Sequence, residues 1–290
     1  MLHIGTRVKK IFLPAKYCMR YPSAINYILF GKGKIKIKKN AVRLPRLPFK
    51  KRITFVSSEE LGQKNGWHFI GIRNGLFLFE NAEEGLVLAQ PHHGALGENL
   101  TWWIPKHGKG TAIDIGGYFG ETAVLLAKRG FENVVVYEPV PENVQLIALN
   151  AQLNKMASRI RVVHAAVCNI DGTIEIESSS PPGSVSFGLH KGDAKYKLEV
   201  SAVSWNSVLN NAVKQDCTFI KVDCEGCEKY LLDIPDELVA KIPYWVIETH
   251  TKELEKEITS KMLRAGFMTD GQKRFTQDIT LIRFVKEGAS

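Results

Sequence analysis

Short apolar runs alternate with helically periodic stretches between residues 111 and 285. An uninterrupted apolar run predicts a buried strand, and apolar positions three or four apart predict a helix. We expect strands at 111–115, 133–138, 160–166, 217–223 and 243–249, and helices at 119–129, 141–153, 205–213, 225–232 and 252–264. Two last runs, 266–270 and 279–285, predict an antiparallel pair at one edge. This order favours an α/β fold with a mostly parallel sheet and helices on both faces.

Other segments have the period-two pattern of antiparallel strands. Residues 53–90 predict a small β region with strands at 53–56, 67–73, 76–79 and 86–89, and Asn74-Gly75 is typical of a hairpin turn. After Asp171-Gly172, residues 173–177 and 197–203 predict a hairpin with a Ser-, Pro- and Gly-rich loop at 178–195. The Lys–Ile alternation around 34–38 also has strand period.

Pro45 and Pro48 then interrupt the chain as a linker would. We therefore expect three parts: a basic N-terminal arm (1–52), a small β-rich region (53–107) and the α/β domain (108–290).

The net charge of +9 belongs to this basic arm. Residues 1–52 hold 15 Lys and Arg and no acid, whereas the rest of the chain carries 24 bases against 30 acids. Such an arm favours an anionic partner, namely RNA, an acidic lipid surface or an anionic substrate, and a solubilising extension is the alternative. The sequence gives no indication of oligomeric state.

Cysteine usage and the lack of targeting signals favour a cytoplasmic protein. No run approaches the roughly 20 apolar residues of a membrane span, and the start lacks the order of a signal peptide. The five cysteines form no even disulfide framework, so we expect free thiols (Cys18, Cys168, Cys217, Cys224 and Cys227). Cys224 and Cys227 have redox or zinc spacing, but flanking acids and the lack of a second ligand pair favour small packing residues.

A glycine-rich turn after the strand at 111–115 indicates a nucleoside site. A dinucleotide fingerprint starting at Gly116 would need glycines where Tyr118 and Glu121 stand. Asp114 at the strand end would repel a pyrophosphate but favours the sulfonium and ammonium of S-adenosylmethionine. We therefore expect a methyl-donor site in which Gly116, Gly117 and Gly120 let the backbone approach the ligand; a plain strand–turn–helix is the alternative.

Glu138 ends the next strand, 24 positions after Asp114, where a carboxylate can accept hydrogen bonds from both ribose hydroxyls. Asn143, Asn150 and Asn154 follow on the next helix. We expect Asn143 to face the ligand and the other two to be capping or surface residues.

A second charged cluster follows the strand at 217–223, where Lys221, Asp223, Glu225 and Glu228 lie within eight residues. Asp223 falls at the carboxyl end of its strand and could hold the donor's ammonium or an acceptor hydroxyl. Glu225 could bind substrate and Glu228 could orient a partner, although acids are also common at a solvated helix start.

His250 follows the strand at 243–249 and should reach the same edge as Asp223. It could take a proton from a hydroxyl nucleophile, or it could be structural. We expect Asp223 or His250 to act as the base. Asp223 and Glu248 could instead hold a divalent ion, but we assign no metal site.

These patterns together resemble the FkbM family of S-adenosylmethionine-dependent methyltransferases over residues 111–285. The resemblance lies in five motifs: Asp114-Ile-Gly116-Gly-Tyr-Phe-Gly120, Tyr137-Glu138-Pro139-x-Pro-Glu-Asn143, Asn150-Ala-Gln-Leu-Asn154, Ala165-Ala166-Val167 before Asp171-Gly172, and Ile220-Lys-Val-Asp223-x-Glu-Gly226-x-Glu228. It implies a Rossmann-like seven-stranded sheet of the class I methyltransferases, here with an N-terminal basic and β-rich extension. It also implies S-adenosylmethionine as the cofactor, main chain around Ala166 beside the adenine, and often O-methylation of sugars or natural products.

The chain departs from the family pattern at several positions. Gly117 and Tyr118 stand where Ala and Asn are usual, and Trp205-Asn206 replaces the usual Leu-Asp. Small residues usually stand at the positions of Cys224 and Cys227.

We expect an O-methyltransferase acting on a hydroxyl of a sugar, glycan or other small metabolite. An RNA methyltransferase that uses the basic arm is the second hypothesis, although no Asn-Pro-Pro motif ends the strand at 217–223. A non-catalytic binding module on the same fold is the third.

Overall fold

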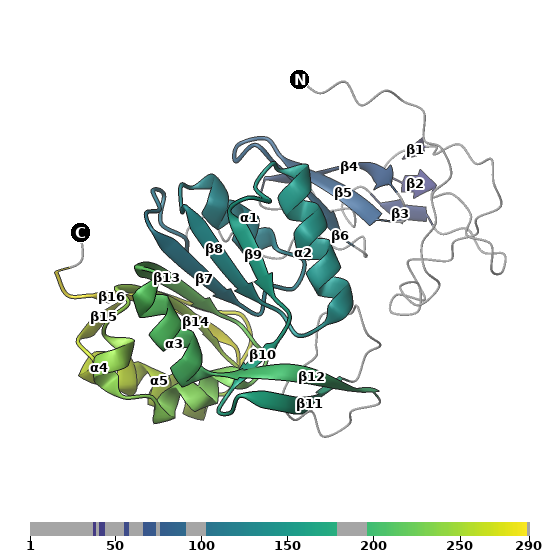
Figure 1. Ribbon diagram of the computed structural model, residues 1–290. Coiled ribbons are helices and arrows are strands. Elements are labelled where there is room, and N and C mark those ends of the chain that lie inside the picture. Colours follow the sequence, from purple (N-terminus) through teal and green to yellow (C-terminus); the bar gives the residue numbers. More distant parts are fainter. Residues whose placement is uncertain are drawn as a thin grey trace. The chain divides into compact units, whose positions relative to one another are not determined.

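The computed structural model describes residues 66–73, 76–90, 103–178 and 196–288, together with three short strands nearer the N-terminus (Figure 1). The chain divides into two compact units, Met1–Asn99 and Leu100–Ser290. In the described residues no helix is both long and apolar enough to cross a membrane.

The first unit holds two antiparallel sheets of three strands each. One contains β1 (Ile37–Lys38), β2 (Ala41–Arg43) and β3 (Phe55–Ser57), and the other contains β4 (Trp67–Arg73), β5 (Leu76–Asn81) and β6 (Leu86–Gln90). The predicted hairpin is confirmed by the pairing of Arg73 with Leu76, while the turn residues 74–75 lie outside the described residues. The strand expected at 53–56 pairs with β2 and not with the hairpin that follows it.

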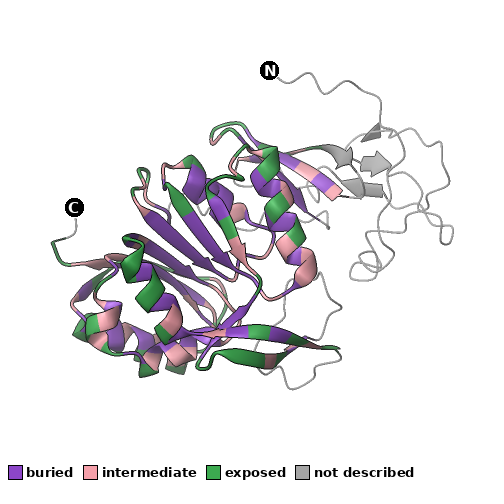
Figure 2. Ribbon diagram, viewed as in Figure 1, coloured by how far each residue is buried: buried purple, intermediate pink, exposed green. Residues whose placement is uncertain are grey.

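The second unit is built on the expected seven-stranded sheet, ordered β15-β16-β14-β13-β7-β8-β9. The bounds are β7 (Thr111–Ile115), β8 (Asn133–Tyr137), β9 (Ile160–Val163), β13 (Cys217–Val222), β14 (Tyr244–Thr249), β15 (Phe267–Arg274) and β16 (Thr280–Lys286). Strands β9, β8, β7, β13 and β14 run parallel, and β16 and β15 form the predicted antiparallel edge. Figure 2 shows the central strands buried, as expected when both faces are covered.

Helices lie against both faces of this sheet. They are α1 (Glu121–Lys128), α2 (Pro141–Leu153), α3 (Trp205–Lys214), α4 (Asp236–Val239), α5 (Lys252–Arg264) and a 3₁₀ helix, η3 (Cys227–Asp233). Ile113 and Val135 share one core with Trp205 of α3 and Ile258 of α5. Because strand side chains alternate, Asp114 and Val136 face the opposite side, where α1 and α2 pack.

The single strand expected at 160–166 is wrong. After Val163 a short turn intervenes, in which the Ala165 N–H donates to the Val163 carbonyl at 2.9 Å. The chain then enters β10 (Ala166–Cys168), which pairs with β12 (Tyr196–Ser204) in a separate three-stranded sheet. β11 (Gly172–Ser178) pairs antiparallel with β12, so the predicted hairpin is confirmed.

The α-helix expected at 225–232 is also wrong, because the chain forms η3 instead. Glu225 and Gly226 have φ values of +56° and +118°, in the left-handed region, so no right-handed helix passes through them. The apolar spacing of the segment resembles a helix, but the turn preceding it delays the helical backbone to Cys227.

Candidate active site

The glycine loop between β7 and α1 packs directly on the loop after β13. Gly116 has φ +85°, and a Cβ there would lie 1.7 Å from the Asp223 carbonyl oxygen. Only glycine fits both the backbone conformation and this close approach. Gly120 caps α1 at φ +88°, whereas a Cβ at Gly117 would meet the Val136 side chain at 2.1 Å. Gly116 therefore allows the glycine loop to contact the loop after β13, and Gly117 allows it to pack against β8.

Glu138 ties the end of β8 to the glycine loop. Its carboxylate accepts hydrogen bonds from the Tyr118 N–H at 2.8 Å, the Val140 N–H at 2.9 Å and the Asn143 side chain at 3.1 Å. Burial raises the pKa of Glu138 to about 7, against the effect of these three donors. A carboxylate has about four lone-pair positions, so one remains for a ligand.

The two asparagines of α2 that lie seven positions apart both face this site. Asn143 donates to Glu138, and its own buried Oδ1 has no hydrogen-bond partner among the described residues. Asn150 is fully buried and donates to the Phe119 carbonyl at 2.7 Å. The capping or surface role expected for Asn150 is therefore wrong, and its two-turn spacing from Asn143 was the available signal. Asn154 is the C-cap of α2, as expected.

A lysine joins the acids of β7 and β13. Asp114 and Lys221 are register partners, and the Lys221 ammonium lies 3.6 Å from Asp114 and 3.0 Å from Asp223. Burial alone would lower the pKa of Lys221, but Asp223 and Asp114 raise it above its usual value. Burial raises the pKa of Asp114 to about 6, although Lys221 opposes this. Lys221 is a site residue for which the sequence suggested no role.

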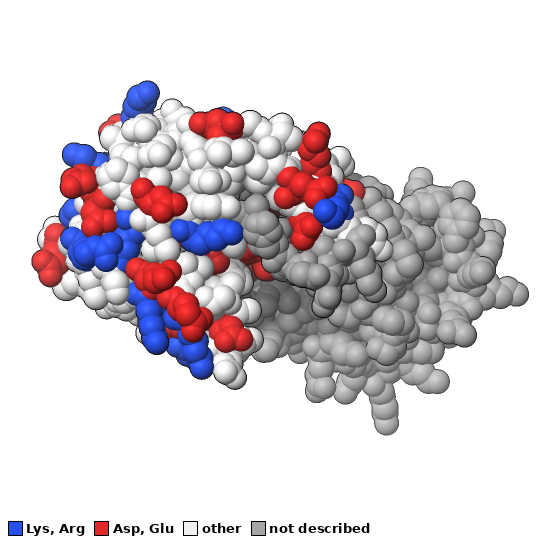
Figure 3. Space-filling model, turned by 90° about the horizontal axis from the view of Figure 1, so that it is seen from below, with Lys and Arg blue, Asp and Glu red and all other residues white. Residues whose placement is uncertain are grey.

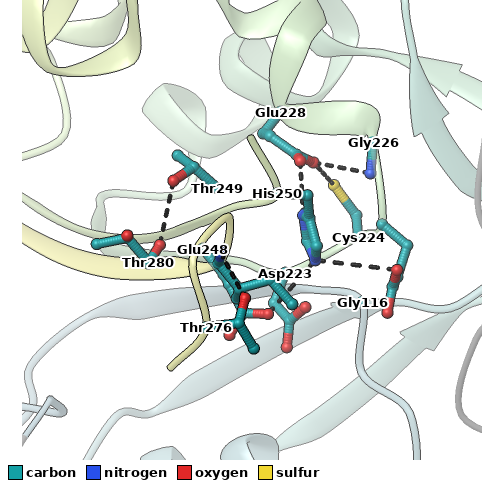
Figure 4. Close-up of polar contacts among 12 residues, drawn as sticks. Gly116, Asp223, Cys224, Gly226, Glu228, Glu248, Thr249, His250, Thr276 and Thr280 are labelled. Carbon is teal, nitrogen blue, oxygen red and sulfur yellow. Dashed lines mark hydrogen bonds and ion pairs between the residues drawn. The ribbon is translucent and has the colours of Figure 1, made fainter. Parts of the chain in front are cut away.

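His250 lies between acids at both ring nitrogens (Figure 4). Its Nδ1 is 2.7 Å from Glu228, and its Nε2 is 3.4 Å from Glu248 and 3.9 Å from Glu225. Burial opposes the charge, but Glu228 and Glu248 raise the pKa of His250 to about 11. His250 is therefore an imidazolium at neutral pH, and Glu228 orients it, as expected of Glu228.

A disulfide joins Cys224 and Cys227, so the expectation of free thiols is wrong for this pair. The left-handed turn at Glu225 and Gly226 brings the two Cα atoms to 5.5 Å, within the range that a disulfide spans. The Cys-x-x-Cys spacing indicated a possible disulfide, but the flanking acids led us to favour free thiols. Cys168 and Cys217 are free, as expected, and both are buried.

The structure brings most of the predicted residues to one edge. Five carboxylates and two cations gather at the carboxyl ends of β7, β13 and β14: Asp114, Asp223, Glu225, Glu228 and Glu248 with Lys221 and His250. Ala166 starts β10, three residues after Val163, whose carbonyl accepts from the Glu138 N–H. The excess of acids fits a positively charged ligand.

Ligand atoms of Asp223, Glu248 and His250 lie within 4.8 Å of one another, which is metal-site spacing. Lys221 already places an ammonium against Asp223, and His250 carries its own proton. These two cations supply charge balance that a divalent ion would otherwise provide.

Comparison with known proteins identifies the class. Residues 114–268, more than half of the 290 residues, match the family described as "Methyltransferase FkbM domain". The chain thus belongs to the FkbM family of methyltransferases. Among curated proteins, none matches this chain.

Several solved structures are similar over part of their length. Methyltransferase FkbM from Methylobacillus flagellatus is 21% identical with a TM-score of 0.44, over 61% of this chain and 43% of that one. A conserved hypothetical protein of Streptococcus pyogenes is 15% identical (TM-score 0.41; 65% and 93% covered). The ribosomal protein L11 methylase of Lactobacillus delbrueckii is 15% identical (TM-score 0.37; 62% and 72% covered). This chain thus spans less than half of the first protein, and the family assignment rests on the sequence match.

The buried acceptors at this edge fit the methyl donor. Both oxygens of Asp114 and Oδ1 of Asn143 have no hydrogen-bond partner among the described residues. Buried acceptors that lack a hydrogen bond are costly, even though the Lys221 ammonium at 3.6 Å partly balances the charge of Asp114. The ammonium and ribose hydroxyls of the donor are groups that could donate to such acceptors.

Proposed function

We propose that this methyltransferase acts on a hydroxyl of a sugar, glycan or other small metabolite. The observation that carries the proposal is the placement of Asp223, which is partly exposed and follows β13 beside the glycine loop. Its carboxylate is the acid best placed to accept a hydroxyl proton next to the donor. The main-chain position is fixed because the Asp223 N–H donates to the Ile115 carbonyl at 2.9 Å.

The donor would be held by residues of three loops. Asp114 would face its ammonium and sulfonium, and Glu138 with Asn143 would bind the ribose hydroxyls. Gly116, Gly117 and Gly120 let the loop backbone pack closely against the loop after β13, the sheet and α2 respectively, and the main chain at Ala166 would border the adenine. When bound, the donor supplies an electrophilic methyl group, so the chain's contribution is positioning and proton removal.

We propose Asp223 as the base and His250 as a positioning residue. His250 is protonated at neutral pH because Glu228 and Glu248 stabilise its charge, so it has no free lone pair for a proton. Its charge instead holds Glu225 and Glu248 at the edge of the site. Glu225, only partly exposed, would contact the acceptor.

An RNA acceptor is the second candidate, and the basic arm at residues 1–52 is the observation that favours it. Against it, the segment after β13 reads Asp223-Cys224-Glu225, whose acids would repel a phosphate backbone.

Transfer of labelled methyl groups in a cell extract tests both candidates. We expect label on an oxygen of a small molecule or glycan, and Asp223→Asn should lower the rate by about 10²- to 10⁴-fold, as for loss of a general base. Glu132→Gln, an exposed residue outside the site, is the matched control. Label on an RNA base, or an unaffected Asp223→Asn variant, would contradict the proposal.

A further inference from the structure

The disulfide lies in the loop after β13, which packs against the glycine loop of the proposed site. Cys224 follows Asp223 directly, and its Cα lies 3.3 Å from where a Cβ at Gly116 would stand. The Asp223 carbonyl is closer still, at 1.7 Å from the same point. Any movement of residues 223–227 therefore reaches the glycine loop through backbone contact.

The same loop also contacts the acid that orients His250. The Gly226 N–H donates to Glu228 Oε2 at 2.9 Å, and Cys224 Sγ lies 3.4 Å from that oxygen. A disulfide sulfur carries no hydrogen, so this contact becomes a hydrogen bond only when Cys224 is a thiol. Reduction would thus give Glu228 a new donor beside His250.

We propose that Cys224 and Cys227 form a thiol–disulfide exchange site whose redox state controls binding of the methyl donor. The inference rests on the proposed donor site for its consequence, whereas the exchange itself does not depend on it.

Exchange would begin at the more accessible sulfur. Cys224 is partly exposed, and Cys227 is only 2% exposed. One thiolate of a dithiol reductant attacks Cys224 Sγ, the Cys224–Cys227 bond breaks, and Cys227 leaves as a thiolate that takes up a proton. The second thiolate of the reductant then attacks the reductant sulfur that is bonded to Cys224. The mixed disulfide breaks, and Cys224 is released as a thiolate that also takes up a proton. Two electrons and two protons pass to the cysteines, and the dithiol becomes a disulfide.

The disulfide constrains the backbone of residues 224–227 beside the proposed donor site. It encloses Glu225 at φ +56°, a conformation that a residue with a side chain adopts at a cost of about 1 kcal/mol or more. Without the covalent link, the left-handed conformation of Glu225 loses one of its constraints, and a change there moves the backbone that contacts Gly116. We therefore expect the disulfide form to bind the donor more tightly.

Thermodynamic linkage gives a test that requires no acceptor. If the disulfide form binds S-adenosylhomocysteine more tightly, then saturating S-adenosylhomocysteine must shift the disulfide equilibrium by the same factor. The protein is equilibrated with dithiothreitol at set ratios of its reduced and oxidised forms, quenched with acid and alkylated. Mass spectrometry then measures the tryptic peptide 222–229, which contains both cysteines. Because the readout is peptide-specific, the other cysteines do not interfere.

We expect both cysteines to be labelled together in one two-electron transition, and the ligand to favour the disulfide by about tenfold, or about 30 mV. The double variant Cys224→Ser, Cys227→Ser should bind the ligand as weakly as the reduced protein and ignore dithiothreitol. The single variant Cys168→Ser, at a buried free cysteine, should behave as the parent.

Three results would overturn the proposal: no oxidation of the pair at any ratio, independent labelling of the two cysteines, or an equilibrium that the bound ligand leaves unchanged. Calorimetry separates these from failure of the donor site itself. If neither form binds S-adenosylhomocysteine, the assigned donor site is wrong, and the coupling fails with it.

Discussion

Glu138 and Asp114 show how a buried acid can be prepared for a ligand. Burial raises the pKa of Glu138 to about 7 and that of Asp114 to about 6, so both lie near the point of protonation at neutral pH. Neutral acids tolerate burial, and the arrival of a cation or hydroxyl donors favours the carboxylate form. The sequence predicted both residues because they lie at the carboxyl ends of apolar strands. It could not show that the Glu138 carboxylate already accepts three hydrogen bonds from N–H groups of the protein.

Gly116 offers a test of the contact between the two loops. Gly116→Ala should lower the free energy of unfolding and abolish donor binding, because the new Cβ would overlap the Asp223 carbonyl at a φ of +85°. We expect a loss of about 3 kcal/mol or more, measured by urea unfolding.

Gly266→Ala is its matched control, since Gly266 has nearly the same φ, +84°, with nothing within 4 Å of the added Cβ. It should lose only about 1–2 kcal/mol from backbone strain and bind the donor normally. Equal losses at the two positions would show that the contact with Asp223 is unimportant.

Among the structural elements, the central parallel strands were predicted best and the segment after β13 least well. The long apolar runs of β7, β8, β13 and β14 give an unambiguous pattern, because a central parallel strand is buried on both faces. The segment at η3 has helical apolar spacing, but a two-residue left-handed turn and a disulfide determine its backbone. Neither local feature leaves a periodic signal.

The ion pair between Glu228 of η3 and His250, which follows β14, predicts that the stability of the protein depends on pH. His250→Asn removes the cation that faces Glu228, which is fully buried, so the variant should be less stable by about 3 kcal/mol at neutral pH. The folded pKa of His250, about 11, is above its unfolded value of 6.5. Its contribution is therefore complete below pH 6.5 and is lost as pH rises through 11, so the gap between parent and variant should shrink from neutral towards alkaline pH.

Urea unfolding at several pH values measures this gap. His164→Asn is the control, because His164 is exposed and its single hydrogen bond within the described part of the chain is to the Pro139 carbonyl. It should change stability by less than about 0.5 kcal/mol. A gap that stays constant or widens towards alkaline pH would show that His250 is not charged in the folded protein.

Across the full chain, the sign of the net charge differs between residues 1–52, which are basic, and the rest of the sequence, which has an excess of acids. Figure 3 shows Lys and Arg interspersed with Asp and Glu on one face of the described part, with no uniform basic surface. The 15 Lys and Arg of residues 1–52 have no acid among them, so they supply the excess of positive charge. The composition shift predicted this separation, but it does not name the partner, because Coulomb attraction to an anion is not specific.

Deleting residues 1–52 tests the role of the basic arm. The full chain should bind single-stranded RNA with an affinity that falls steeply as salt rises, because each neutralised phosphate releases counterions. The shortened chain should lose this binding and keep its affinity for the methyl donor. RNA binding that survives the deletion would place the anionic partner's site elsewhere, and salt-independent binding would contradict an electrostatic arm.

We expect the acids at the carboxyl edge of the sheet to bind a positively charged nucleoside. A calorimetric titration with S-adenosylmethionine, repeated with Asp114→Asn and with NADH, measures this binding. S-adenosylmethionine should bind saturably and about tenfold or more weakly to the variant, and NADH should not bind. Binding of NADH, or an affinity for S-adenosylmethionine that Asp114→Asn leaves unchanged, would contradict it.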